Sequence, residues 1–308
     1  MERDIEGQRK EKDNAMNCIK KNLLVLMVSS FYIHHTYAVD VNAGDYTTLP
    51  TGTNVGVLYY QHSEMDGYYQ NGNKVNAKST SDIGITRFIH YTDIWGIRVT
   101  PQIIIPFGNV RNTSVGGTSL NDTTDFADPI IASAFWLINQ PENGASGRYL
   151  AFTPFIYLPI GQYDKYKVVN LGENRFKVDL QMVWVQPLYN KLSFEFYQDF
   201  IWYGNNDKAG NGNQTLSQDT SYQTQINLRY DFNLMQRIAL GYATNYGGDQ
   251  SLDGIDLHQD MQKQQVRFEY QQMINPETQL SAQLVRDTQV ESGFKKELGL
   301  NLRLLRIF

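Results

Sequence analysis

The chain has 308 residues, with 27 Lys and Arg against 32 Asp and Glu, and a mean hydropathy of -0.44. It has no run of 18 or more apolar residues, which excludes a conventional transmembrane helix. The acidic balance argues against a nucleic-acid-binding protein, because such proteins normally carry a basic patch. The single cysteine, Cys18, excludes a disulfide framework.

Residues 1–38 are predicted to be an N-terminal extension followed by a cleavable signal peptide. A short apolar run at 23–33 follows Lys20 and Lys21 and precedes the small-x-small sequence that ends at Ala38. This order of basic, apolar and small residues is typical of a secretory signal, whereas a buried helix, the alternative, has no need of these flanks. We expect cleavage after Ala38, which leaves residues 39–308 as a single domain with 21 Lys and Arg against 27 Asp and Glu.

Residues 39–53 are rich in Gly, Thr and Pro and predict an extended lead-in. The rest of the chain is a series of segments in which apolar and polar residues alternate, the pattern of a β-strand with one apolar face. Several of them are 9 to 11 residues long, which is the length that a tilted strand needs to cross a bilayer. The twelve predicted strands are 55–64, 80–91, 96–107, 127–139, 148–160, 174–187, 191–203, 219–232, 236–247, 262–274, 278–290 and 295–308.

The connections between these segments alternate between long and short until the last hairpin. Outer-membrane barrels have this alternation, with short periplasmic turns and long extracellular loops. The 20 Tyr, 15 Phe and 4 Trp gather at the ends of the predicted strands, where aromatic side chains anchor a barrel at the membrane interface. The sequence therefore predicts an all-β fold, a transmembrane antiparallel up-and-down barrel of about twelve strands. An ordinary β-sandwich with Tyr at its rims is the alternative.

The last strand ends the chain on a phenylalanine and is similar to the C-terminal insertion signal of bacterial outer-membrane barrels. Arg306 departs from that pattern, since an apolar residue is usual there. The expected partners are outer-membrane lipid and, during insertion, the barrel-assembly machinery. The apolar residues assigned to this signal are Leu298, Leu300, Leu302, Leu304 and Phe308.

The opposite face of the strands carries charges of both signs and is predicted to line the lumen. It is either a polar pore wall that selects solutes or a network of ion pairs that fills a narrow barrel. We favour the network, because twelve strands lie between the ~8 that side chains can fill and the ~16 that leave an aqueous channel. The lumen-facing candidates are Arg98, Lys177, Asp179, Glu195, Asp199, Arg229, Asp231, Arg267, Glu269, Asp287, Glu297 and Arg303.

Five short segments stand out by their order and spacing: LPTGTNVGVLYY at 49–60, YYQNGNKV at 68–75, PQIIIPFG at 101–108, Asp128-Pro129 and FTPFIYLPIGQYD at 152–164. Together they resemble the outer-membrane family known as the MetA pathway of phenol degradation, also called the SphA-like transporter family. The resemblance runs from about Asp45 to Phe308. It implies uptake of aromatic or other hydrophobic compounds, and it supplies no catalytic or ligand residues.

Motifs for enzyme chemistry are sparse. A barrel phospholipase would need a histidine near a lipid-facing serine, and neither His62 nor His90, each predicted near a strand end, has such a signature. The loop at 204–214 is rich in Asn, Asp and Gly but lacks the spacing of an EF-hand, so we expect a solvated loop rather than a Ca²⁺ site. No cofactor, metal or catalytic residue is predicted.

The sequence thus predicts an exported protein of the Gram-negative outer membrane that forms a channel for passive uptake of small, aromatic or hydrophobic solutes. Two alternatives stay open. One is a barrel hydrolase of the phospholipase kind, and the other is a structural or adhesive barrel with a plugged lumen.

The terminal residue gives a first prediction. Deletion of Phe308, or Phe308→Ala, lowers the amount of assembled barrel in the outer membrane, because the insertion signal ends on this side chain. Fractionation followed by a heat-modifiability gel measures the assembled form. Unchanged assembly in both variants would show that the terminal Phe is not needed.

Overall fold

The computed structural model describes residues 39–141, 147–210 and 212–308. The predicted signal peptide and Cys18 lie outside the described residues. Within those ranges all the regular secondary structure is β-strand. No helix in the described part of the chain is long and apolar enough to cross a membrane.

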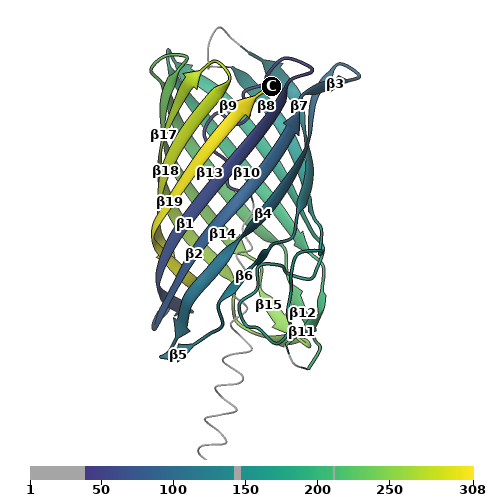
Figure 1. Cartoon of the computed structure of the whole chain (residues 1–308), viewed down its shortest axis with the longest axis vertical. Coiled ribbons are helices and arrows are strands. Elements are labelled where there is room, and N and C mark those ends of the chain that lie inside the picture. The colour runs from purple at the N-terminus through teal and green to yellow at the C-terminus, as the bar shows by residue number, and fades with distance from the viewer. Residues whose placement is uncertain (1–38, 142–146, 211) are drawn as a thin grey trace, which may run out of the picture.

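Twelve long strands form one closed antiparallel barrel (Figure 1). Each pairs with its neighbours in chain order, and β1 pairs with β19 to close the cylinder, so the predicted fold class and strand number are confirmed. The strands of the barrel are β1 (Asn54–Gln70), β2 (Asn73–His90), β4 (Ile97–Val115), β7 (Ile130–Gln140), β8 (Arg148–Tyr157), β9 (Lys177–Tyr189), β10 (Leu192–Tyr203), β13 (Ser221–Asp231), β14 (Gln236–Gly247), β17 (Met261–Asn275), β18 (Thr278–Val290) and β19 (Gly293–Ile307).

The seam between the first and last strands explains why the barrel closes. It runs from the pair Val55 and Ile307 to the pair Tyr69 and Gly293, with irregularities near its far end. At the near end Asn54 and Phe308 exchange two backbone hydrogen bonds of 3.3 and 2.8 Å. Hydrocarbon offers no partner for a free N–H or C=O group, so an open edge at this seam would be costly in a membrane.

The first hairpin is longer than the sequence pattern predicts. Residues 65–79 are predicted as a loop, and instead β1 and β2 continue to a tight turn at Asn71 and Gly72. Both turn residues have positive φ, 50° and 74°, which is the conformation that Asn-Gly favours in a two-residue hairpin turn. The lengthening also places His62 in the middle of β1 rather than near its end.

Seven short strands lie outside the twelve. β3 (Thr92–Ile94), β5 (Thr118–Ser119) and β6 (Thr123–Phe126) pair with β4. β11 (Asn206–Ala209), β12 (Gln214–Gln218), β15 (Gln250–Leu252) and β16 (Ile255–Asp256) form a separate four-stranded sheet at the end with the long connections (Figure 1).

That small sheet corrects the expectation of a solvated loop at 204–214. Ala209, Leu216 and Leu252 pack together in its interior, and Asn206 accepts a hydrogen bond from the side chain of Asn174. Asp207 accepts a hydrogen bond from the hydroxyl of Thr215. Among the described residues no group of three or more His, Cys, Asp or Glu side chains could hold a metal ion.

The outer surface carries the apolar face of each strand. On β19 the alternate residues Leu298, Leu302 and Leu304 are 40–50% exposed, and Phe308 is 72% exposed. Arg306 also points outward, and it pairs with Glu277 in the turn before β18 at 2.7 Å. This pairing lies at the end with the short turns, so the arginine is compensated at the membrane boundary rather than left within the apolar band.

Two glycines let β2 and β4 approach closely. The ring of Phe107 lies over Gly84, 2.5 Å from where a Cβ would be. A Cβ on Gly108 would meet the backbone itself, at 2.3 Å from the carbonyl oxygen of Asp82 and 2.8 Å from Cα of Ile83. A flexible side chain can move away from such a contact, but a paired strand cannot.

Gly108→Ala is therefore expected to destabilise the folded barrel by about 1–3 kcal/mol, the usual cost of overpacking. The measurement is the temperature at which the compact band is lost on a heat-modifiability gel. Gly212→Ala is the matched control, because its nearest contact is 3.3 Å to the flexible Gln214 side chain. Equal transition temperatures for the two variants would contradict the expectation.

Candidate functional site

Residues 39–49, which we call the inner segment, lie inside the barrel, and residues 50–52 are exposed. A turn at residues 43–46 interrupts this segment, with hydrogen bonds from Asp45 N to Asn42 O and from Thr47 N to Gly44 O. The expectation of an extended lead-in is therefore wrong. Val41, Ala43 and Tyr46 are buried, so the segment fills part of the lumen.

Two ion pairs and two carboxylates fix this segment to the wall. Asp40 pairs with Arg267 on β17 at 2.6 Å, and Asp45 pairs with Arg303 on β19 at 2.5 Å. Glu269 accepts hydrogen bonds from the Asn42 side chain at 2.7 Å and from Ala43 N at 3.2 Å. The backbone N of Gly44 donates to Glu195 on β10 at 3.1 Å. Arg267, Arg303, Glu269 and Glu195 are all lumen-facing candidates of the sequence.

Most of the other inward charges of β9 to β18 pair with a charge nearby, and we call this side of the lumen the charged wall. Arg229 is completely buried and bonds to both Glu195 and Asp231. Lys177 pairs with Glu173 at 2.8 Å and lies over the ring of Tyr157. A lone charge buried here would be costly, and these pairs offset that cost.

The remaining candidates on this wall lie deep in the lumen. Asp199 accepts a hydrogen bond from Gln181 at 2.7 Å, and Asp179 is completely buried on the neighbouring strand. Asp287 binds Lys263 at 2.6 Å.

At the short-turn end the segment is held by groups from three elements. Arg98 on β4 donates to Leu49 O and to the Thr51 hydroxyl, and it bonds to Asp93 in β3 at 2.6 Å. The guanidinium of Arg98 and the hydroxyl of Thr51 hold the pKa of Asp93 below its usual value. Trp136 Nε1 donates to the carbonyl of Tyr46 at 3.2 Å. Arg98 thus serves the mouth of the barrel rather than its centre.

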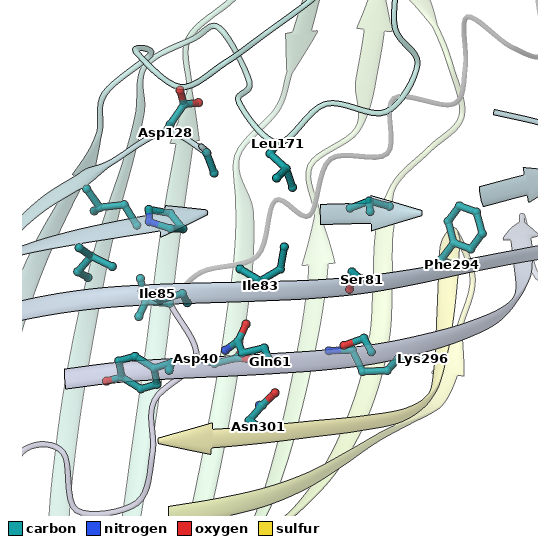
Figure 2. Close-up of a pocket in the computed structure, with 18 of the residues that line it drawn as sticks. Asp40, Gln61, Ser81, Ile83, Ile85, Asp128, Leu171, Phe294, Lys296 and Asn301 are labelled. Atoms are coloured by element: carbon teal, nitrogen blue, oxygen red, sulfur yellow. The ribbon is translucent and has the colours of Figure 1, made fainter. Parts of the chain in front are cut away.

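The opposite side of the lumen is largely apolar. It borders a cavity of about 330 Å³ (Figure 2). Val39, Asp40 and Val41 of the inner segment also line this cavity, so the cavity lies between the segment and the barrel wall. We call the following side chains of β1, β2, β4, β7 and β8 the apolar wall: Met65, Ile83, Ile85, Ile104, Ile130 and Tyr157.

A sequence signal for the apolar wall existed. Segments 55–62, 130–139 and 149–160 are apolar on both alternating faces, and Arg87 stands alone among the apolar residues of its face. In the structure Arg87 faces the lumen, where Gln102 accepts its hydrogen bond at 2.7 Å and Asp45 lies 3.9 Å away. Strands apolar on both faces have one face toward lipid and the other toward the inner segment or the cavity.

Glu297 does not face the lumen as expected. Glu64 pairs with Leu298 and Met65 pairs with Lys296, so Glu297 is the extra residue of a β-bulge. It bonds instead to Arg286, whose side chain is exposed, at 3.1 Å, and to Lys295 at 3.1 Å. The bulge turns Lys296 toward the cavity, a residue that the alternation of the sequence does not predict.

His62 faces outward and does not form the arrangement that a barrel phospholipase needs. Its Nδ1 lies 2.7 Å from Asp82, and its Nε2 lies 3.7 Å from Glu64. Within the described ranges no serine or threonine hydroxyl hydrogen-bonds to this ring. Arg111 also pairs with Asp82 and occupies the carboxylate that would orient the histidine. His90 bonds to the side chain of Asn54.

A closed barrel with an apolar outer band, short turns at one end and long connections at the other defines an outer-membrane β-barrel protein. The family model described as "Putative MetA-pathway of phenol degradation" matches residues 66–304, and the chain belongs to this family. No curated protein matches the sequence.

Solved structures give the same assignment. The COG4313 outer membrane channel from Pseudomonas putida F1 is 35% identical, with a TM-score of 0.83, over 87% of this chain and 100% of that chain. The β domain of the Bordetella autotransporter BrkA (9% identity, TM-score 0.51, 84% and 100% covered) shares the fold alone. So does the translocator domain of NalP from Neisseria meningitidis (9% identity, TM-score 0.50, 96% and 97% covered).

The contacts of Asp45 give a prediction about the inner segment. Asp45→Asn weakens the hydrogen bond to Arg303, a charge-assisted bond that contributes about 1.5–3 kcal/mol, and removes the ion pair with Arg87 at 3.9 Å. The loss of one such bond makes release of the segment about tenfold to hundredfold more frequent. Planar-bilayer recordings are expected to show larger and noisier conductance.

The control for this experiment is Asp66→Asn. Asp66 pairs with Lys74 near the tip of the first hairpin, where both side chains are about half exposed. The substitution Asp66→Asn removes the same charge from a side chain that lies outside the lumen. Identical recordings from both variants would mean that Asp45 does not hold the segment in place.

Proposed function

We propose that the protein is a passive outer-membrane channel for small hydrophobic solutes, including aromatic ones. The observation that carries the proposal is the cavity of about 330 Å³ between the apolar wall and the inner segment. A volume of this size falls at the lower end of small-molecule sites. The apolar wall gives one side of the cavity, and polar and charged side chains such as Gln61, Lys263 and Gln283 complete its lining. The family membership and the likeness to a COG4313 outer membrane channel support it.

The division of the lumen gives each wall a role in this proposal. The charged wall binds the inner segment, which leaves few free charges to attract ions or sugars. The apolar wall stays open to the cavity, so a solute that enters exchanges water for Ile83, Ile85 and Ile104. Such a solute gains roughly 25 cal/mol for each Å² of apolar surface removed from water. Movement down a concentration gradient then needs no cofactor and no chemical step.

Two other functions fit these contacts less well. The matched structures reported above include a channel and no enzyme, and the two nitrogens of His62 face Asp82 and Glu64 rather than a hydroxyl nucleophile. A purely structural barrel would have no use for a cavity lined by apolar side chains next to a completely buried ionic network.

The test is uptake of labelled naphthalene by cells with an intact lipopolysaccharide outer membrane, because hydrophobic solutes cross plain phospholipid vesicles unaided. Expression of the protein is expected to speed uptake, and a protonophore to leave the rate unchanged. Ile83→Asn is expected to slow uptake several-fold, since it replaces apolar surface of the wall by an amide.

Thr80→Asn, on the outward face of the same strand, is the control and should leave uptake unchanged. Uptake that is equal with and without the protein would overturn the proposed function and favour the structural barrel. If both variants reduce uptake to the same extent, the apolar wall does not line the solute pathway.

A further inference from the structure

One end of the cavity carries a lysine without a partner. Lys296 lines the cavity, and within the described part of the chain its ammonium group makes no hydrogen bond or ion pair (Figure 2). The hydroxyls of Ser63 and Ser81 line the same end and, among the described residues, also lack hydrogen-bond partners. Both serines are more than 90% buried, with 6% and 3% of their surface exposed.

From this cluster we propose that the solute is an amphipathic carboxylate, with its carboxylate at Lys296, Ser63 and Ser81 and its apolar body on the apolar wall. The proposal rests on the proposed function and names the substrate class of the same cavity. A carboxylate accepts hydrogen bonds only, and the ammonium group and the two hydroxyls are the donors that match it.

The backbone places Lys296 at this end by two local devices. The bulge at Glu297 turns the lysine inward, as described above. Gly299 then leaves room for its stem, because a Cβ there would lie 2.9 Å from Cδ of Lys296 and 3.3 Å from Cβ of Val285. Gly299 pairs with Ser63, and Ser63 pairs with Ser81, so the lysine stem runs toward the two hydroxyls.

The neighbouring charges leave Lys296 as the surplus cation. Lys263 pairs with Asp287 at 2.6 Å, and Arg267 pairs with Asp40 at 2.6 Å. These are the charged groups that face Lys296 from β17, β18 and the inner segment. Each carboxylate among them already binds a cation, which leaves one positive charge for a ligand to neutralise.

The apolar body of the ligand has a defined course. Ser81, Ile83 and Ile85 are successive inward residues of β2, and Figure 2 shows all three along one strand beside the cavity. Inward side chains of a strand are about 7 Å apart, so an aryl or alkyl chain attached to the carboxylate reaches Ile83 and Ile85 in turn. Beyond them Arg87 is engaged with Gln102 and Asp45 and does not compete for the carboxylate.

The test compares 4-phenylbutyrate with its neutral counterpart 4-phenylbutanol. Titration calorimetry on the full chain in phosphatidylcholine nanodiscs, with empty nanodiscs subtracted, measures both affinities. We expect the carboxylate to bind about tenfold or more tightly than the alcohol, since a hydrogen bond to a charged group is worth that much. Lys296→Met is expected to remove this preference by lowering the affinity for the carboxylate to about that for the alcohol, whereas Lys296→Arg retains the preference.

Lys295→Met is the matched control, because Lys295 pairs with Glu297 outside the lumen. A compact band on a heat-modifiability gel confirms that each variant is folded. Equal binding of the acid and the alcohol, or a preference that survives Lys296→Met, would overturn the carboxylate proposal alone. If neither compound binds to the unaltered protein, the proposed function is overturned as well. Acetate that binds as tightly as 4-phenylbutyrate would show an anion site without a role for the apolar wall.

Discussion

Every backbone N–H and C=O group that faces hydrocarbon must find its partner within the protein, and this requirement determines the architecture. An up-and-down sheet meets it only when its first and last strands pair, which β1 and β19 do along most of their length. Once the cylinder is closed, the residues that face outward must be apolar, whereas those that face inward are free of that condition. The inner surface can therefore carry both a completely buried pair such as Arg229 and Glu195 and a run of isoleucines.

The two sides of the lumen differ because the inner segment forms its ion pairs with the charged wall, whereas the apolar wall borders the cavity. Charges of β10, β17 and β19 bind residues 40–45, and each charge-assisted hydrogen bond among them contributes about 1.5–3 kcal/mol. The apolar side chains of β2 and β4 have no such role and border free space. The ion-pair network and the proposed solute path, which the sequence presents as alternatives for one surface, thus lie on different sides of the same barrel.

The features that the sequence predicts correctly are those that contact with lipid imposes on it. Lipid selects for an apolar residue at every second position, so alternation located most of the strands. Segments 55–62, 130–139 and 149–160 are apolar on both faces and were located as apolar runs between polar loops. Residues 65–79 extend beyond the lipid and carry no such pattern, although Asn71-Gly72 is a recognised hairpin turn. The bulge at Glu297 shifts the alternation of inward and outward residues by one position. A two-residue pattern in the sequence does not show where such a shift occurs. The contacts of the inner segment could not be predicted for a different reason, because its partners lie as far as 258 positions away in the sequence.

The position of Asp45 has a consequence for the order of assembly. Its carboxylate contacts Arg303 on β19 and Arg87 on β2, the strands on either side of β1. One side chain therefore bridges the seam from within, and it can do so only when both strands are in place. The contacts of Asp45 are therefore complete only after β19 has paired with β1.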